Sequence, residues 1–92
     1  MSVHQSEIAS GIQLIPNPAK DELQVKLANP VEAAPAQFIV YDTRGRIHLE
    51  KELDLGRVIF TINTSQLSTG IYYCMVKSQG SIHKTEKLII IR

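Results

Sequence analysis

The chain has 92 residues, a formal net charge of +1 and a hydrophobic content of 43%. This length allows one small domain with a single core, and a deep catalytic cleft would be hard to build in it. The near-zero net charge argues against nucleic acid as a partner, because such a partner requires a basic stripe on the protein. No apolar stretch approaches the roughly 18 to 20 residues that span a bilayer.

The first third of the sequence predicts two short strands separated by a proline corner. Residues 1–11 are polar and aperiodic, so we expect a linker or a non-native tail there. They lack the basic and apolar regions of a secretory signal, so export would require a signal in an upstream segment. Ile12–Ile15 is a short strand that ends at Pro16–Pro18, where two prolines stiffen the backbone. Glu22–Leu27 alternates apolar and polar residues, which predicts a half-buried strand.

The middle third predicts a central strand, a tight turn and an edge strand. Gln37–Tyr41 is a nearly continuous apolar run, typical of a central strand covered on both faces. Asp42–Gly45 predicts a type I turn with its glycine in the left-handed region. Arg46–Leu53 is predicted as an edge strand with Ile47 and Leu49 inward, and its outward charges would protect it from pairing with other chains.

The last third contains the longest runs of strand-type residues. Arg57–Asn63 has alternating apolar residues, and Thr64–Thr69 predicts a tight crossover with its one leucine in the core. Gly70–Lys77 and Ser81–Arg92 then form two long strands, joined by a turn in which Gly80 supplies a positive φ.

These segments amount to about seven short strands with turn signals every ~8 to 12 residues and no helical period. The pattern predicts an all-β fold, an immunoglobulin-like antiparallel β-sandwich of about seven strands. Tyr72 and Cys74 have the spacing of the tyrosine corner and cysteine of immunoglobulin strands, although the second cysteine and the tryptophan of those domains are missing.

None of the chemically active side chains predicts a catalytic, cofactor-binding or metal site. We interpret Cys74, the one cysteine, as a small buried hydrophobic residue, with a reactive thiol or an intermolecular bridge as the alternative. The histidines lack metal-ligand spacing and are expected at the surface; they are His4, His48 and His83. A strand start explains Asp21 and Glu22, and a charged edge strand explains Glu50 and Glu52. We therefore predict no enzyme activity and no cofactor.

Three segments together resemble a known family. Ile15–Val25 looks like its opening Pro-Asn-Pro-Ala motif, which an acidic residue and an alternating strand follow. Val40–Arg46 is similar to its central Val-Tyr-Asp-x-x-Gly-Lys/Arg motif. Leu67–Tyr73 and Lys87–Ile90 resemble its closing Leu-x-x-Gly-Ile/Val-Tyr and Lys-Leu motifs. The family is the type A C-terminal sorting domain of the type IX (Por) secretion system, and the resemblance covers roughly residues 12–92.

The resemblance implies a seven-stranded immunoglobulin-like sandwich that serves as the C-terminal secretion signal of a cargo protein and has no catalytic role. Such domains direct cargo from the periplasm across the Gram-negative outer membrane to the cell surface or outside. A sortase-like peptidase commonly removes the domain, and the cargo can be joined to an anionic lipopolysaccharide. The implied partners are the outer-membrane type IX machinery and this peptidase, and we expect any cleavage site in residues 1–11 or upstream.

The predicted recognition residues come from these motifs and from the final strand. They are Pro16, Asn17, Pro18, Asp42, Gly45, Gly70, Tyr72, Lys87, Leu88, Ile90 and Arg92.

Most of these residues are expected to act through the fold. Gly45 and Gly70 should adopt backbone angles that a side chain opposes, so valine at either position should destabilise the domain. We expect Lys87 and Arg92 to mark the final strand, whose unpaired backbone would be read by strand addition. Either Leu88 and Ile90, or Ile89 and Ile91, would anchor that strand in the core.

Two further functions stay open on the sequence alone. A surface adhesion or carbohydrate-binding sandwich would need exposed aromatics in a shallow groove, or a calcium cage of carboxylates. A domain that stays attached to its cargo would be able to form a homodimer through an apolar edge strand, by pairing or by exchange.

Overall fold

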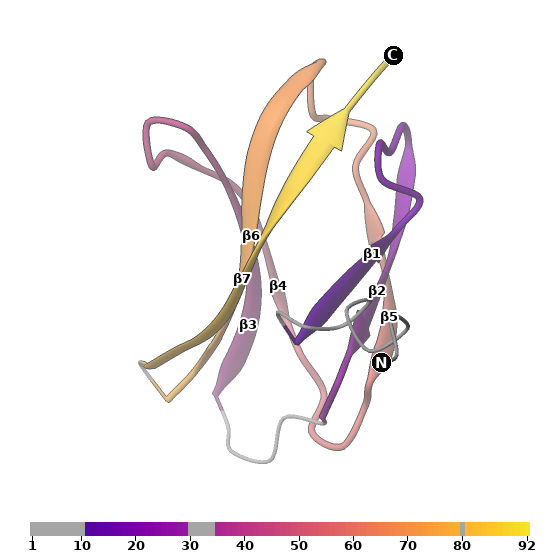
Figure 1. Cartoon of the computed structure of the whole chain (residues 1–92). Coiled ribbons are helices and arrows are strands. Elements are labelled where there is room, and N and C mark those ends of the chain that lie inside the picture. Colours follow the sequence, from indigo (N-terminus) through magenta and orange to yellow (C-terminus); the bar gives the residue numbers. More distant parts are fainter. Residues whose placement is uncertain (1–10, 30–34, 80) are drawn as a thin grey trace, which may run out of the picture.

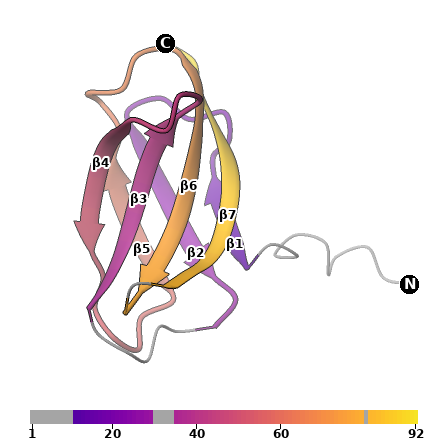
Figure 2. The same ribbon diagram turned by 90° about the vertical axis from the view of Figure 1, so that its left-hand side faces the viewer.

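The computed structural model describes residues 11–29, 35–79 and 81–92, and this part of the chain is all-β. Two antiparallel sheets pack face to face as an immunoglobulin-like sandwich, with the strand orders β1-β2-β5 and β4-β3-β6-β7 (Figure 1). Figure 2 views the four-stranded sheet from its outer side. The strands are β1 Ile12–Ile15, β2 Glu22–Leu27, β3 Ala36–Asp42, β4 Ile47–Glu52, β5 Ile59–Asn63, β6 Gly70–Ser78 and β7 Ser81–Ile90. The fold class and the strand positions predicted from the sequence are confirmed.

The core lies between the two sheets because the strands alternate with a period of two residues. In β2, Leu23 and Val25 are fully buried, and the neighbouring β5 buries Phe60 and Ile62. Phe60 meets Phe38 of the opposite sheet edge to face, with ring centroids 5.6 Å apart. The alternation visible in the sequence thus identifies the inward side of these strands correctly.

Strand β3 is central in its sheet, as its apolar run predicts. Phe38 and Val40 face the core and are fully buried. Ile39 points to the other side of the sheet, yet it is only 3% exposed. The side chains of Phe38–Val40 are therefore buried on both faces of the sheet.

Strand β4 lies at the edge of the sheet as predicted, but the prediction that Ile47 faces inward is wrong. Val40 pairs with Leu49, whereas the next residue, Tyr41, pairs with Ile47, so His48 is an extra residue in β4. Such a β-bulge shifts the alternation by one residue. Leu49 still packs on the core, while Ile47 turns to the outer face and is 50% exposed.

The crossover and the last hairpin largely match the sequence analysis. Leu67 is 3% exposed and belongs to the core. In the β6–β7 turn, Gln79 has a positive φ of 51°, and the prediction for Gly80 lies outside the described residues.

The predicted N-terminal tail, residues 1–11, lies outside the described residues except for Gly11. Gly11 is buried, and its carbonyl oxygen accepts a hydrogen bond of 3.0 Å from the Ala28 amide. Gly11 is therefore part of the packed domain.

Candidate functional site

The end of β7 is anchored in the core by one of its two faces. Leu88 and Ile90 are fully buried, whereas Ile91 is 53% exposed and Ile89 is partly buried. The first of the two alternatives from the sequence, anchoring by Leu88 and Ile90, is therefore confirmed. The Lys87 side chain is exposed and forms no ion pair with any residue that the structure describes.

The Pro16–Ala19 segment runs along the outer edge of this same strand end. The Asn17 side chain donates from Nδ2 to the Lys87 carbonyl oxygen, and its Oδ1 accepts from the Ile89 amide, both at 3.0 Å. Ala19 donates to the Ile89 carbonyl at 2.8 Å and accepts from the Ile91 amide at 2.9 Å. The amide side chain of Asn17 thus occupies the place of a peptide group in a neighbouring strand.

These contacts give the Pro-Asn-Pro-Ala motif a role in addition to the stiff corner expected from its two prolines. Both prolines follow cis peptide bonds, at Ile15–Pro16 and Asn17–Pro18, and Ala19, which follows them, pairs in parallel with Ile90 of β7. The expectation that the final strand offers unpaired backbone is wrong for Lys87–Ile91, because Asn17 and Ala19 already bind that edge.

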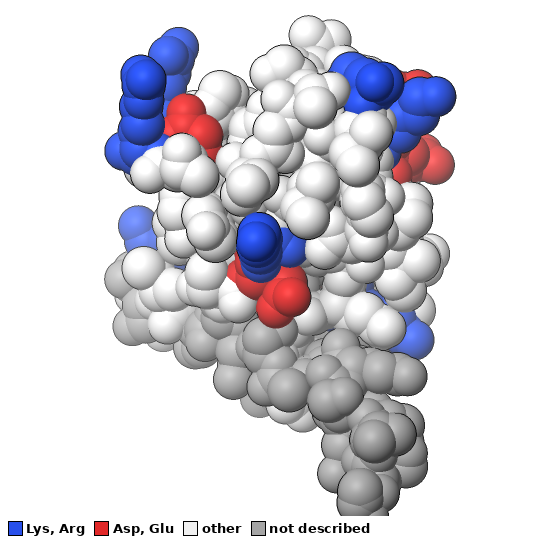
Figure 3. Space-filling model, turned by 45° about the horizontal axis from the view of Figure 1, so that its top comes forward, with Lys and Arg blue, Asp and Glu red and all other residues white. Residues whose placement is uncertain are grey.

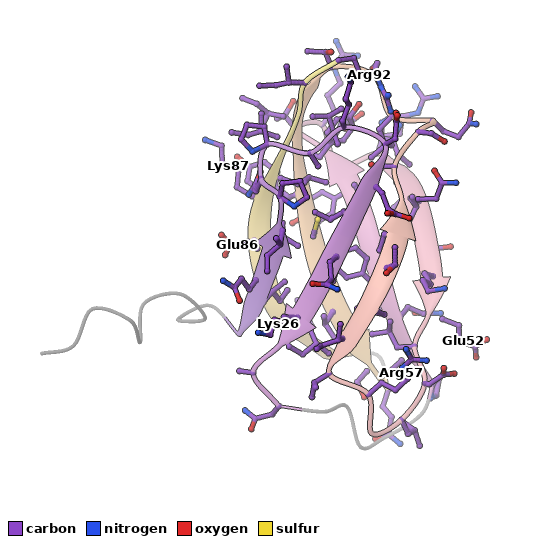
Figure 4. All side chains as sticks on the ribbon, turned by 90° about the vertical axis from the view of Figure 1, so that its right-hand side faces the viewer. Lys26, Glu52, Arg57, Glu86, Lys87 and Arg92 are labelled. Atoms are coloured by element: carbon purple, nitrogen blue, oxygen red, sulfur yellow. The ribbon has the colours of Figure 1, made fainter. Side chains whose placement is uncertain are left out.

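Arg92 binds the protein itself at the end of the sandwich (Figure 4). Its guanidinium donates to the carbonyl oxygens of Thr64 and Leu67, each at 2.6 Å, and Nη1 lies 2.5 Å from Asp21 Oδ1. Its backbone amide donates to Thr69 Oγ1 at 3.1 Å. Only 29% of the side chain is exposed, so Arg92 fastens the chain end to the crossover.

The crossover that Arg92 binds is also tied to the β1–β2 connection. Thr64 is fully buried, its hydroxyl donates to the Lys20 carbonyl at 3.0 Å, and its amide donates to the Asp21 carbonyl at 2.9 Å. Three segments distant in sequence therefore meet at the end of β7.

Asp42 and Gly45 form the tight turn between β3 and β4, as predicted. The Gly45 amide donates to the Asp42 carbonyl at 2.9 Å, and Gly45 has a φ of 86°. Asp42 Oδ1 accepts from the amides of Arg44 and Arg46 at 2.9 and 3.0 Å. This is the usual reason for an aspartate at the start of a turn.

His48 has specific partners that sequence analysis did not identify. Its Nε2 lies 2.9 Å from Asp42 Oδ2, and its ring meets the Tyr72 ring edge to face at 5.4 Å. The bulge in β4 places it there. The hydrogen bond from His48, followed by the one from the Arg46 amide, lowers the pKa of Asp42 to about 2.

Tyr72 forms the tyrosine corner that its spacing to Cys74 predicts. The ring is 4% exposed, and its hydroxyl donates to the Ser68 carbonyl four residues upstream at 2.8 Å. Gly70, two residues earlier, differs from the prediction, because its φ lies outside the left-handed region. A Cβ at Gly70 would lie 3.8 Å from the Tyr72 ring, an ordinary contact, so the expected backbone reason for this glycine is wrong.

Cys74 is a core residue. It is fully buried, and burial raises the pKa of its thiol to about 12, with a smaller contribution from the charge of Glu86. A thiol that stays protonated is a poor nucleophile, so the interpretation as a small hydrophobic residue is confirmed.

The described residues offer no cluster of metal ligands, and no helix among them is long and apolar enough to cross a membrane. A hollow of about 300 Å³ lies between the ends of β4 and β5, away from the motif residues, and Lys51, Asp54 and Arg57 are among the residues that line it. On the surface shown in Figure 3, most charged side chains lie in small groups that contain both basic and acidic residues, with uncharged atoms between the groups.

The fold and these contacts define a class of protein: a small immunoglobulin-like domain whose first and last sequence motifs meet at its last strand. Residues 13–91 match the family model described as the secretion system C-terminal sorting domain. The chain therefore belongs to this family, and it is a type IX secretion sorting signal that marks an exported protein for the cell surface or the exterior. No curated protein matches the chain.

Proposed function

We propose that the type IX outer-membrane machinery recognises this domain in its folded state, at the corner where Pro16–Ala19 meets the end of β7. The observation that carries this proposal is the hydrogen bonding of Asn17 and Ala19 to Lys87–Ile91, which joins the first and last motifs into one surface. A surface assembled from such distant segments exists only after folding. The machinery would thereby distinguish a folded domain from an unfolded chain.

The predicted recognition residues divide into two groups on this proposal. Most are structural: Leu88, Ile90 and Tyr72 through burial, Gly70 through its pairing with Ile90, Asn17 and Arg92 through the hydrogen bonds described above, and Asp42 and Gly45 through the β3–β4 turn. Pro16, Pro18 and Lys87 are exposed beside it, and Lys87 forms no ion pair within the described residues. Lys87 is therefore the residue that we expect to touch the machinery.

The test is export of a periplasmic reporter that carries this chain at its C-terminus in a type IX-competent cell. Lys87→Glu should lower the exported fraction and leave the melting temperature of the domain unchanged. Lys26→Glu is the matched control, because Lys26 lies on the outer face of the other sheet (Figure 4). Equal export of both variants would exclude a contact at Lys87. Normal export of a domain that lacks residues 87–92 and is still folded would exclude the proposed function.

We further propose that a sortase-like peptidase removes the domain after passage through the periplasm, or that the cargo is joined to an anionic lipopolysaccharide. The expected cleavage region, residues 1–11 or upstream, precedes the first strand, and because Gly11 is packed in the domain, the cut should lie before Gly11. Mass spectrometry of the released reporter would locate the cut. An unprocessed reporter without attached lipid at the cell surface would contradict both steps.

A further inference from the structure

The outer face of the β4-β3-β6-β7 sheet is unusually apolar. Side by side across the strands lie Ile47, Tyr41 and Tyr73, then Ile71 and Ile89, with Ile39 in the centre. Ile47 and Ile71 are 50% and 46% exposed, and the Tyr41 and Tyr73 rings lie 5.9 Å apart. The outer side of an antiparallel sheet normally faces water with polar side chains. An apolar patch of this kind marks an interaction surface.

The outer face of the three-stranded sheet provides the contrast within the same molecule. Its paired positions carry mostly polar side chains: Gln13, Glu22, Gln24, Lys26, Thr61 and Asn63. Ile15 and Ile59 stand among them and are 39% and 41% exposed. The apolar character is thus specific to one side of the sandwich.

Charges of opposite sign border the apolar face. Glu50 and Glu52 lie on its β4 side, at positions paired with Ile39 and Gln37, whereas Lys77 and Lys87 lie on β6 and β7. Figure 4 shows Glu52 and Lys87 at opposite edges of the molecule. None of these four side chains forms an ion pair within the described part of the chain.

We propose that this face binds a second copy of the chain, with the two sheets face to face around a two-fold axis parallel to the strands. Such an axis places β4 of each copy over β7 of the other, and β3 over β6. In this arrangement Lys87 of one copy lies over the Ile47 end of its partner's β4, two paired positions from Glu50, and Lys77 lies over β3 beside Glu52. The tyrosines of the two copies meet in the middle. The surface is self-complementary, as a two-fold interface requires. It differs from the edge-strand homodimer expected from the sequence, which stays a prediction.

The size of the face sets the expected affinity. Four strands spaced ~4.8 Å apart, over about six residues each, give a footprint on the order of 400 Å². Stable interfaces bury roughly 800 Å² of accessible surface per partner, so this dimer belongs at the weak end of the range. A transient dimer that forms only in the upper part of a micromolar concentration series is therefore expected.

Sedimentation velocity of the purified 92-residue chain, over a concentration series up to several hundred micromolar, tests the proposal without the secretion machinery. The wild type should shift from monomer to dimer. Ile71→Lys should raise the dissociation constant at least tenfold, whereas Ile59→Lys should leave it unchanged. Ile59 has similar exposure on the other outer face, so it controls for the general effect of a lysine on a strand. Circular dichroism melting of both variants confirms that they are folded.

Charge reversal tests the orientation. The variant E50K/E52K makes both borders basic, and K77E/K87E makes both acidic, so each alone should be monomeric. A mixture of the two should form a heterodimer.

A wild-type chain that stays monomeric throughout the series would overturn the proposal, as would equal effects of Ile71→Lys and Ile59→Lys. A mixture that stays monomeric would overturn the orientation. Loss of reporter export in Ile71→Lys with a monomeric wild type would assign the face to another protein.

Discussion

The two edge strands of the four-stranded sheet, β7 and β4, are protected from other chains in different ways. The C-terminal half of β7 is covered by Asn17 and Ala19, which lie about 70 residues earlier in the sequence. Strand β4 depends on local features: the bulge at His48, the Asp42–Gly45 turn and the charges of Glu50 to Glu52.

The difference between these strands separates two kinds of stabilisation. The contacts of β7 are long-range, so they form only when the whole sandwich has closed. The contacts of β4 connect residues a few positions apart, and they are largely exposed to water, where each contributes little. Substitutions at the end of β7 should therefore destabilise the domain more than substitutions around β4.

The largest effect is expected at the buried side of β7. Ile90→Ala removes a fully buried side chain and should lower the free energy of unfolding by about 2 to 5 kcal/mol. Ile91→Ala, one residue further and 53% exposed, should change it by no more than about 0.5 kcal/mol. Urea denaturation of both variants measures the difference. Similar losses would show that β7 is not anchored by one face.

Removal of the Arg92 side chain should have the next largest effect. Arg92→Ala loses its hydrogen bonds to Thr64 and Leu67 and its ion pair with Asp21. Because the site is partly exposed, we expect a loss of about 1 to 2 kcal/mol. Arg44→Ala, in the exposed β3–β4 turn, should cost less than about 0.5 kcal/mol. Equal urea midpoints for the two variants would contradict the structural role of Arg92.

The Asn17 side chain should contribute somewhat less to stability than that of Arg92, since its two hydrogen bonds lie at an exposed edge. Asn17→Ala should lower the free energy of unfolding by about 1 kcal/mol. It should also increase the hydrogen-exchange rate of the Ile89 amide, which donates to Asn17. Asn29→Ala, at an exposed loop position, is the control and should leave that rate unchanged. An Ile89 amide that exchanges equally slowly in both variants would refute the covering role of Asn17.

On the β4 side, substitution of the turn glycine Gly45 should have an effect of similar size that depends on backbone angle. Gly45→Ala places a side chain at a φ of 86°, where no neighbouring atom obstructs it. The remaining cost is backbone strain, which should lower the free energy of unfolding by about 1 kcal/mol. Gly70→Ala has no such strain and should be close to neutral. Thermal melting of the two variants distinguishes them. A larger loss at Gly70 would restore the original expectation for that glycine.

The smallest effect concerns the charge of Asp42 and appears only in acid. Its pKa is about 2 in the folded domain and 3.8 ordinarily, so its contribution is complete above about pH 4. It should be lost as the pH falls through about 2. Asp42→Asn should therefore differ from the wild type by a constant amount from pH 7 to 4, and the difference should shrink below that. Parallel melting curves for both proteins down to pH 2 would contradict the lowered pKa.

Much of the fold was predictable because its signals are local. Alternating residues in Glu22–Leu27 identify a half-buried strand, since side chains of a β-strand point to opposite faces in turn. The Asp42–Gly45 turn and the Tyr72–Cys74 spacing also depend on neighbours along the chain, and both were confirmed. The order and spacing of the motifs pointed to the sorting-domain family, which the family match shows.

Predictions from local sequence patterns were wrong where a strand or turn departs from ideal geometry. An inserted residue such as His48 leaves no mark in the hydrophobic pattern, so Ile47 was placed on the wrong face. Gly70 matches a family motif, but the motif does not reveal its backbone angle.

The amino-acid sequence by itself thus determined the strands, their turns and the inward side of most of them, because these follow from backbone geometry within a few residues. Only the tertiary structure decided the sheet order, the pairing of Asn17 with β7, the docking of Arg92 on the crossover and the one-sided apolar face. Those features join residues distant in the sequence. A period of two residues tells which side chains lie together on a strand, and it carries no information about the strand that will lie next to it.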